Sequence, residues 1–169
     1  ENAVIVASAI GGSSNATTHL IAIAKHMGVK FDLSNWQKLG HKIPLLVDCQ
    51  PAGKHLMEGF FRAGGVPAVM KELIKNKKLN TKVMTVTGKK LGDNLKSNIK
   101  VDSDVIKTFK TNLTENAGFL ILKGNFFSSA TMKTSVISNE FKKRYLSNPK
   151  NPNSFICKAV VFEGPEDYH

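Results

Sequence analysis

The stretch that decides the fold is residues 1–29, ENAVIVASAIGGSSNATTHLIAIAKHMGV. It opens with a continuous apolar segment over residues 3–10, which has the length of a core element and ends at the Gly-Gly turn 11–12. After this turn, Ser13 or Ser14 can cap a helix. Apolar residues then recur at helical spacing until the next glycine, namely at Ala16, Leu20, Ile23, Ala24 and Met27. The stretch therefore predicts a core segment, a glycine turn and a helix.

The rest of the first half adds further helices and one short buried segment. Asp32 or Ser34 can cap a short helix that reaches Gly40, where glycine favours a left-handed exit. Residues 43–47 are an apolar run that predicts a buried strand, although a buried helical turn has the same pattern. Residues 54–63 predict a helix, and the next helix carries a proline in its first turn. The apolar stripe of that next helix consists of Val69, Met70, Leu73 and Ile74.

The second half predicts strands and a domain boundary. Short β-branched or aromatic runs alternate with Gly, Ser and Asn, as expected of strands. These runs are VMTV (83–86), GFLILKG (118–124), KTSVIS (133–138) and KAVVFEG (158–164). The stretch 88–104 is polar and poor in large apolar residues, so we place a domain junction near residues 95–102. The predicted class is α/β, with an α/β domain over residues 1–95 and a β-rich domain over 96–169.

Three features are expected near the C-terminal end. Residues 140–146 predict a short helix, and SNPKNPNS (147–154) predicts a surface loop. The sequence GPED at 164–167 has the composition of a helix start, with proline first and acids in the first turn. Because a helix that begins here does not continue, we expect the chain to be an interior piece of a longer protein.

Composition and charge favour a globular protein with a solvated, lysine-rich surface. Hydrophobic residues make up 41% of the chain, and no apolar run approaches the roughly 18 residues of a membrane span. The net charge is +11, which favours anions, but the lysines are scattered and no nucleic-acid motif is present. We therefore expect no membrane and no nucleic acid as partner. Cys49 and Cys157 are too few for a disulfide framework, so a reducing, cytoplasmic location is the default.

A few polar residues could bind a substrate. The turn formed by Ser13, Ser14 and Asn15 precedes a helix start, where backbone N–H groups can meet an anion. His19 lies one turn into that helix, and Lys54 could face a carboxylate. Spacing alone favours structural roles for these residues, namely a serine cap, a satisfied core or surface histidine and an exposed lysine at a helix start. No HExxH, GxSxG or GxxxxGK[ST] pattern is present, so no metal site or nucleophile is predicted.

Three blocks of sequence, in order, resemble the dihydroxy-acid dehydratase and 6-phosphogluconate dehydratase family. The stretch 1–29 resembles the family's GGS[ST]NA-x-x-H-L-x-A-I-A segment, and 43–73 resembles P-[SA]-G-K-x-x-M-E followed by AGG-[LV]-PAVMK. The stretch 83–95 is similar to LTVTGKTLAENL. In place of RGNLAP-DGAVIK, residues 123–135 read KGNFFSSATMKTS, which looks like the sugar-acid branch, that is, the pentonate or xylonate dehydratases.

The resemblance implies a fold and an activity. The fold would be the end of an N-terminal α/β domain followed by the beginning of a C-terminal β-barrel-like domain. The whole enzyme would be a homo-oligomeric hydro-lyase that dehydrates a 2,3-dihydroxy acid to a 2-keto-3-deoxy acid, using an iron-sulfur cluster and Mg²⁺. Alternatives are a dihydroxy-acid dehydratase of branched-chain amino-acid biosynthesis, with a mitochondrial location also open, a catalytically dead relative, and a non-enzymatic module that binds anions or nucleic acid.

The family motifs that carry the catalytic groups do not occur in this sequence. The cluster cysteines belong to CDK-type and GACGG-type motifs, and the serine base belongs to a later motif. The resemblance therefore assigns no catalytic residue and no metal ligand here, and we expect the chain alone to be inactive and to bind neither cofactor. Its substrate-pocket candidates are Ser13, Ser14, Asn15, His19 and Lys54.

Overall fold

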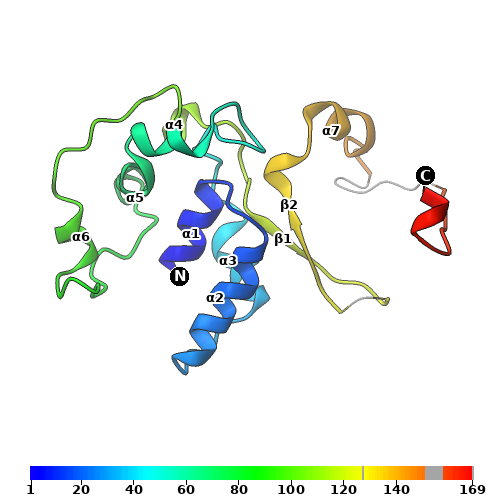
Figure 1. The fold of residues 1–169 in the computed structure, drawn as a ribbon, viewed down its shortest axis with the longest axis horizontal. Coiled ribbons are helices and arrows are strands. Elements are labelled where there is room, and N and C mark those ends of the chain that lie inside the picture. The colour runs from blue at the N-terminus through cyan, green and yellow to red at the C-terminus, as the bar shows by residue number, and fades with distance from the viewer. Residues whose placement is uncertain (127, 151–157, 169) are drawn as a thin grey trace. The chain divides into compact units, whose positions relative to one another are not determined.

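The apolar segment near the N-terminal end forms helix α1 (Asn2–Ala9) in the computed structural model, which describes residues 1–126, 128–150 and 158–168 (Figure 1). Val4, Ile5, Val6 and Ala9 are buried, and helices on several sides contact α1. A helix that is apolar all round has to be buried, which explains why this segment shows no helical periodicity. The core is therefore built around α1.

The described residues form two compact units, Glu1–Val136 and Ile137–His169. The elements of the first unit are α1, α2 (Asn15–His26), α3 (Leu33–Gly40), α4 (Met57–Arg62), α5 (Gly65–Lys75), α6 (Leu91–Asn94), η1 (Phe109–Thr111), β1 (Phe119–Leu122), β2 (Ala130–Lys133) and η2 (Thr134–Val136). The elements of the second unit are α7 (Asn139–Tyr145) and η3 (Pro165–Tyr168). None of the helices in these described parts is long and apolar enough to cross a membrane.

Helix α2 confirms the helix predicted after the glycine turn. It ends at His26, and Gly28 with φ +68° turns the chain away. Only part of its apolar stripe is covered. Leu20 packs on a core cluster, whereas Ile23 and Met27 are 58% and 75% exposed.

Helix α3 confirms Asp32 as its cap. The Asp32 carboxylate accepts hydrogen bonds from the backbone N–H groups of Ser34 and Asn35, at 2.8 Å and 3.3 Å. The left-handed exit predicted at Gly40 is wrong, because Gly40 is the last helical residue and has no positive φ. A Cβ at Gly40 would lie 2.5 Å from the Ser8 hydroxyl of α1. Glycine is needed there for the close approach of α1 and α3.

Replacing Asp32 with alanine is expected to lower the melting temperature at neutral pH. Hydrogen bonds from the Ser34 hydroxyl and from the backbone of Ser34 and Asn35 lower the pKa of Asp32. A carboxyl whose pKa is lower in the folded state stabilises the fold above its unfolded pKa, and this stabilisation is lost as pH falls through the folded pKa. The melting temperatures of the wild type and of Asp32→Ala, measured across pH, should therefore converge in acid. Asp32→Asn is the control, because asparagine can still cap the helix without a charge. A difference between wild type and Asp32→Ala that stays the same in acid would contradict the prediction.

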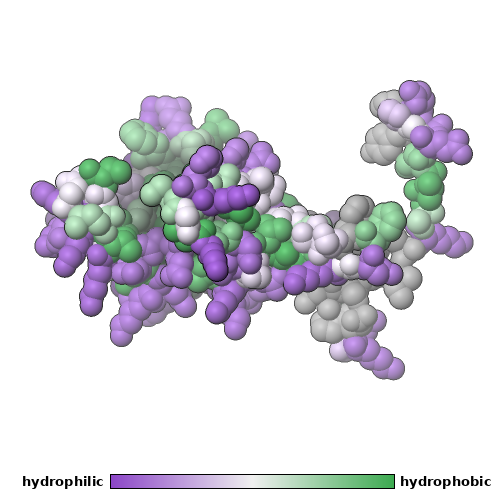
Figure 2. All heavy atoms as spheres, turned by 90° about the horizontal axis from the view of Figure 1, so that it is seen from below, coloured by the Kyte–Doolittle hydropathy of each residue, from purple (hydrophilic) through white to green (hydrophobic). Residues whose placement is uncertain are grey.

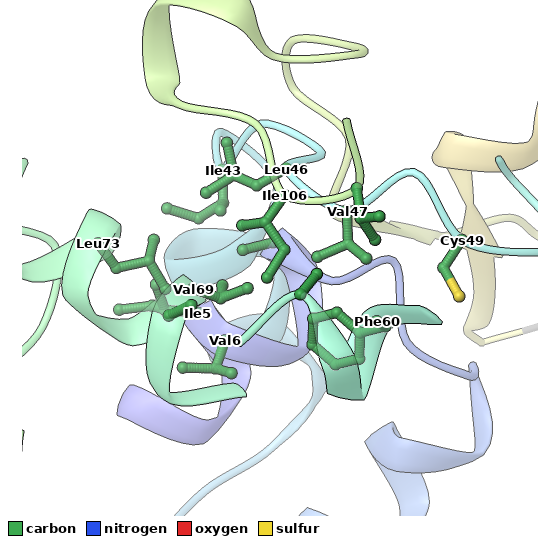
Figure 3. Close-up of a cluster of buried hydrophobic side chains, with 14 of the residues drawn as sticks. Ile5, Val6, Ile43, Leu46, Val47, Cys49, Phe60, Val69, Leu73 and Ile106 are labelled. Carbon is green, nitrogen blue, oxygen red and sulfur yellow. The ribbon is translucent and has the colours of Figure 1, made fainter. Parts of the chain in front are cut away.

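Residues 43–47 are buried, as predicted, but in place of the predicted strand they form only isolated bridges. Leu45 pairs with Thr114 and Val47 pairs with Ile106. The backbone N–H of Leu46 donates to the carbonyl of Ala9 over 2.8 Å, so this segment also hydrogen-bonds to the end of α1. Figure 3 shows Leu46 and Val47 among the apolar side chains of the main core.

Helix α5 matches the predicted stripe, whereas α4 is shorter than predicted. Val69 and Leu73 are fully buried (Figure 3). Met70 and Ile74 are partly buried and pack against the same core cluster. Helix α4 starts only at Met57. The preceding residues form a loop closed by Asp48, whose side chain accepts from the Lys54 N–H and whose carbonyl accepts from the His55 N–H.

Strands β1 and β2 form an antiparallel hairpin in register from Phe119↔Lys133 to Leu122↔Ala130. The Phe119 ring meets Trp36 of α3 edge to face, with centroids 5.3 Å apart. The backbone N–H of Ile121 donates to the Gln37 side chain of α3 over 2.9 Å. These contacts attach the hairpin to α3.

Three of the four strand predictions are wrong for the described residues. In 83–86 only Met84 forms a bridge, to Lys90; residues 134–136 form the turn η2; and 158–162 have no regular structure. A strand needs a backbone partner, and no other strand pairs with these runs in the described part of the chain. The remaining run, GFLILKG (118–124), contains β1 and is confirmed. A β-barrel-like second domain therefore remains a proposal.

The predicted junction near residues 95–102 also remains a prediction about the domains of the full-length protein. Val105, Ile106 and Phe119, which lie beyond that point, belong to the cores of the first unit.

The second unit agrees with the short helix predicted over 140–146. Helix α7 is capped by the Ser138 hydroxyl, which accepts from the Phe141 N–H over 3.1 Å. The predicted helix start at 164–167 is the 3₁₀ turn η3. In the predicted loop, residues 147–150 are exposed and 151–154 lie outside the described residues.

Candidate functional site

A cavity of about 410 Å³ lies in the first unit, beside the glycine turn between α1 and α2. Its wall comes from that turn, from residues 47–51, from α4 and from the end of β2. The polar or chemically reactive groups of the wall are on Ser13, Ser14, Cys49, Gln50 and Lys133.

The glycine turn has little freedom to move. Gly11 has φ +64°, and a Cβ there would lie 2.8 Å from Leu45 Cδ1. The backbone N–H of Gly12 donates to the carbonyl of Ala7 over 2.8 Å, which folds the turn back on α1. The Ser13 hydroxyl accepts from the Asn15 N–H over 3.2 Å, whereas the Ser14 side chain makes no capping hydrogen bond. The turn thus presents two hydroxyl groups to the cavity.

Lys133, the last residue of β2, supplies the positive charge of the site. Its ammonium group donates to the carbonyl of Gly11 over 2.6 Å and thereby links the hairpin to the turn. The side chain is half-buried, and desolvation lowers the pKa of Lys133. Sequence reasoning missed this residue because 122 positions separate the two partners, so no local pattern marks the contact.

The loop 48–55 forms the opposite wall and is held by its own backbone. The N–H of Gly53 donates to the Cys49 carbonyl, and the N–H of Gln50 donates to the His55 carbonyl, each over 2.8 Å. Cys49 is a free, buried thiol at the edge of the core cluster (Figure 3). Met57 and Phe60 of α4 complete an apolar side of the cavity.

The structure brings together only some of the residues selected from the sequence. Ser13 and Ser14 line the cavity with Lys133, whereas Asn15, His19 and Lys54 are not among its lining residues. All three of the latter are exposed, and Lys54 contacts Asp48 through its backbone N–H. The role of these candidates in substrate binding stays a prediction.

The described residues do not form a metal centre. Within residues 1–126, 128–150 and 158–168, no group of three or more His, Cys, Asp or Glu is placed to hold a metal ion. Cys157 lies outside the described residues. The described residues therefore assign no complete ligand set to an iron-sulfur cluster.

The chemistry of the cavity wall favours a small polar anion. The wall offers an ammonium group and hydroxyls but no carboxylate. On the face seen in Figure 2, hydrophilic side chains are widely spread and apolar ones lie between them.

The sequence of the chain is similar to those of known proteins. Residues 1–94 match the family model "Dihydroxy-acid/6-phosphogluconate dehydratase N-terminal". D-xylonate dehydratase of Caulobacter vibrioides is 48% identical over 169 residues, which are 100% of this chain and 28% of that protein. L-arabinonate dehydratase of Rhizobium leguminosarum bv. trifolii is 37% identical over 99% of this chain and 27% of its own length. Dihydroxy-acid dehydratase of Cytophaga hutchinsonii is 43% identical over 74% of this chain and 23% of its own length.

The chain spans about a quarter of the length of these curated relatives, at 28%, 27% and 23%. The matching model covers 94 of the 169 residues, which is more than half of the chain. The resemblance found in three sequence blocks is thereby confirmed. The chain belongs to the dihydroxy-acid/6-phosphogluconate dehydratase family.

Proposed function

We propose that this chain is part of a hydro-lyase that converts a sugar acid with 2,3-dihydroxy substitution into a 2-keto-3-deoxy acid. The observation that carries the proposal is the match to a D-xylonate dehydratase over the whole chain at 48% identity. The cavity supports it, because hydroxyl groups and one ammonium suit a small polyhydroxylated monoanion.

A dihydroxy-acid dehydratase of branched-chain amino-acid biosynthesis is the second candidate. Two relatives of that name align with 74% of the chain at 43% identity and with 99% of the chain at 36% identity, whereas the D-xylonate dehydratase aligns with 100% of the chain at 48% identity. The higher identity over the full chain favours a sugar acid. Turnover of a branched 2,3-dihydroxy acid in preference to D-xylonate and L-arabinonate would reverse this choice.

The reaction removes the C2 proton and expels the C3 hydroxyl as water, and the resulting enol becomes the 2-keto acid. The lining residues described above can bind and orient the substrate, but they supply no carboxylate to act as base. We propose that other segments of the full-length protein supply the base and the ligands of the iron-sulfur cluster and Mg²⁺. A homo-oligomeric state and a cytoplasmic location are part of the same proposal.

Within this chain, we propose that Ser13, Ser14, Asn15, His19 and Lys54 lie close to the substrate in the full-length protein. Ser13 and Ser14 already line the cavity. Asn15 and His19 occupy the first turns of α2, whose N-terminal end favours negative charge. Lys54 lies in the loop that precedes α4.

In the full-length protein, Asn15→Ala and His19→Ala are expected to lower kcat/KM about two- to tenfold, the effect of losing one hydrogen bond to the substrate. Both residues are exposed here, so melting temperatures should change little. Steady-state kinetics on D-xylonate and thermal unfolding of the same samples measure the two effects. Thr18→Ala, at an exposed position of the same helix, is the matched control. Full activity together with a lowered melting temperature would assign these residues to the scaffold.

A further inference from the structure

The feature that the proposed function leaves unexplained is a half-buried cation without a counter-ion. In the described parts of the chain, the ion pairs are Arg62–Glu58 and Lys96–Asp93, and neither involves Lys133. The hydrogen bond from Lys133 to the Gly11 carbonyl uses one of three N–H donors. Two donors therefore remain without an acceptor in the described residues.

An ammonium group in this position is costly for the fold. Burial weakens its hydration, and a neutral carbonyl replaces only part of that hydration. Removal of the positive charge would be cheaper for stability, yet the side chain sits where its charge faces a cavity. A desolvated charged group that lies in a cavity is a candidate for a binding site.

We propose that Lys133, in the same cavity wall as Ser13 and Ser14, is the subsite that receives the carboxylate of the sugar acid. The carboxylate accepts the two free ammonium N–H groups, while the Gly11 carbonyl keeps the ammonium in place. This proposal rests on the proposed function for its substrate, but the charge and the cavity support it independently.

The number of cations selects a carboxylate over a phosphate. Lys133 is the one Lys or Arg among the residues that line the cavity in the described part of the chain. A monoanionic carboxylate matches one ammonium, whereas a phosphate dianion would keep an uncompensated charge in a partly apolar pocket. Met57 and Phe60 give the same cavity an apolar side.

The link to Gly11 also gives Lys133 a positioning role. Gly11 begins the turn that carries both serines, so the Lys133 hydrogen bond fixes the hydroxyls and the charge in one arrangement. A substitution that keeps the hydrogen bond but removes the charge separates the two roles. Lys133→Gln has this property, and Lys133→Met removes both.

The test is the affinity of the full-length protein for D-xylonate, measured by calorimetry. Loss of a charge-assisted hydrogen bond should raise the Kd about 10- to 100-fold in both Lys133→Met and Lys133→Gln. KM should rise more than kcat falls, and Lys133→Arg should recover part of the affinity because it retains the charge. Lys107→Met is the matched control, since the Lys107 ammonium also donates to a backbone carbonyl, that of Ser103, away from the cavity.

Three further probes assign the ligand chemistry. Neutral D-xylose should bind equally weakly to the wild type and to Lys133→Gln, and inorganic phosphate should not compete with D-xylonate at comparable concentration. Wild-type affinity for D-xylonate in a folded Lys133→Gln, or phosphate binding tighter than D-xylonate binding, would overturn the proposal. Carboxylate binding that depends on Lys133 without any turnover would leave the subsite standing and refute the proposed function. Turnover that is insensitive to Lys133→Gln would refute the subsite and leave the proposed function standing.

Discussion

Replacing Trp36 with alanine is expected to lower the free energy of unfolding by about 3–5 kcal/mol, the range for truncating a large buried aromatic side chain. Trp36 is 0% exposed and packs edge to face on Phe119. Its cluster joins Val4 of α1 and Leu20 of α2 to the hairpin, so the cavity left by alanine has no single neighbour that can fill it. Urea unfolding of wild type and variant measures the difference.

Trp36→Phe is the control for this prediction. The Trp36 Nε1–H is buried and has no hydrogen-bond partner among the residues that the structure describes. Phenylalanine removes this unsatisfied donor while it keeps a ring against Phe119, so we expect a much smaller loss than with alanine. A Trp36→Ala loss no larger than that of Val29→Ala, at an exposed position, would show that the cluster does not stabilise the fold.

Replacing Gly53 with alanine is expected to lower the free energy of unfolding by about 1–3 kcal/mol, the usual cost of forcing an extra group into a well-packed region. A Cβ at Gly53 would lie 2.4 Å from the Asp48 carbonyl carbon and 2.5 Å from the Cys49 nitrogen. Both are backbone atoms, so the loop 48–55 itself has to move. Because Cys49, Gln50 and Pro51 line the cavity, substrate affinity in the full-length protein should fall as well.

Gly59→Ala provides the matched comparison six positions further along the chain. Gly59 lies in α4, and the nearest atom to a Cβ there is His55 Cβ at 3.7 Å. Alanine is a better helix former than glycine, so this variant should be neutral or stabilised by up to about 1 kcal/mol. Equal unfolding free energies for Gly53→Ala and Gly59→Ala would contradict the close approach seen at Asp48.

Local signals predicted the helices well. The carboxylate of Asp32 and the proline at position 67 act within one turn of their own position, so a short window of sequence contains the whole cause. The strand predictions at 83–86 and 133–138 failed for the opposite reason. Their β-branched composition describes a side-chain preference, but a strand also needs a backbone partner, which composition does not provide.

The sequence predicted only those parts of the candidate site that depend on neighbouring residues. Ser13 and Ser14 were found because the glycine turn and the helix start are adjacent in sequence. The glycine at position 40 was assigned the wrong role, because its cause is the Ser8 side chain of another helix.

By itself, the sequence determined the family, the helices α2, α3 and α5, and the glycine turn, because each depends on residues close together in the chain. Only the tertiary structure decided that the N-terminal apolar segment is a buried helix and that Lys133 meets this turn. Likewise, only the tertiary structure decided that the loop 48–55 lines the same cavity through Cys49, Gln50 and Pro51. Burial and charge placement depend on which distant segments pack together, and that is settled only when the whole core forms.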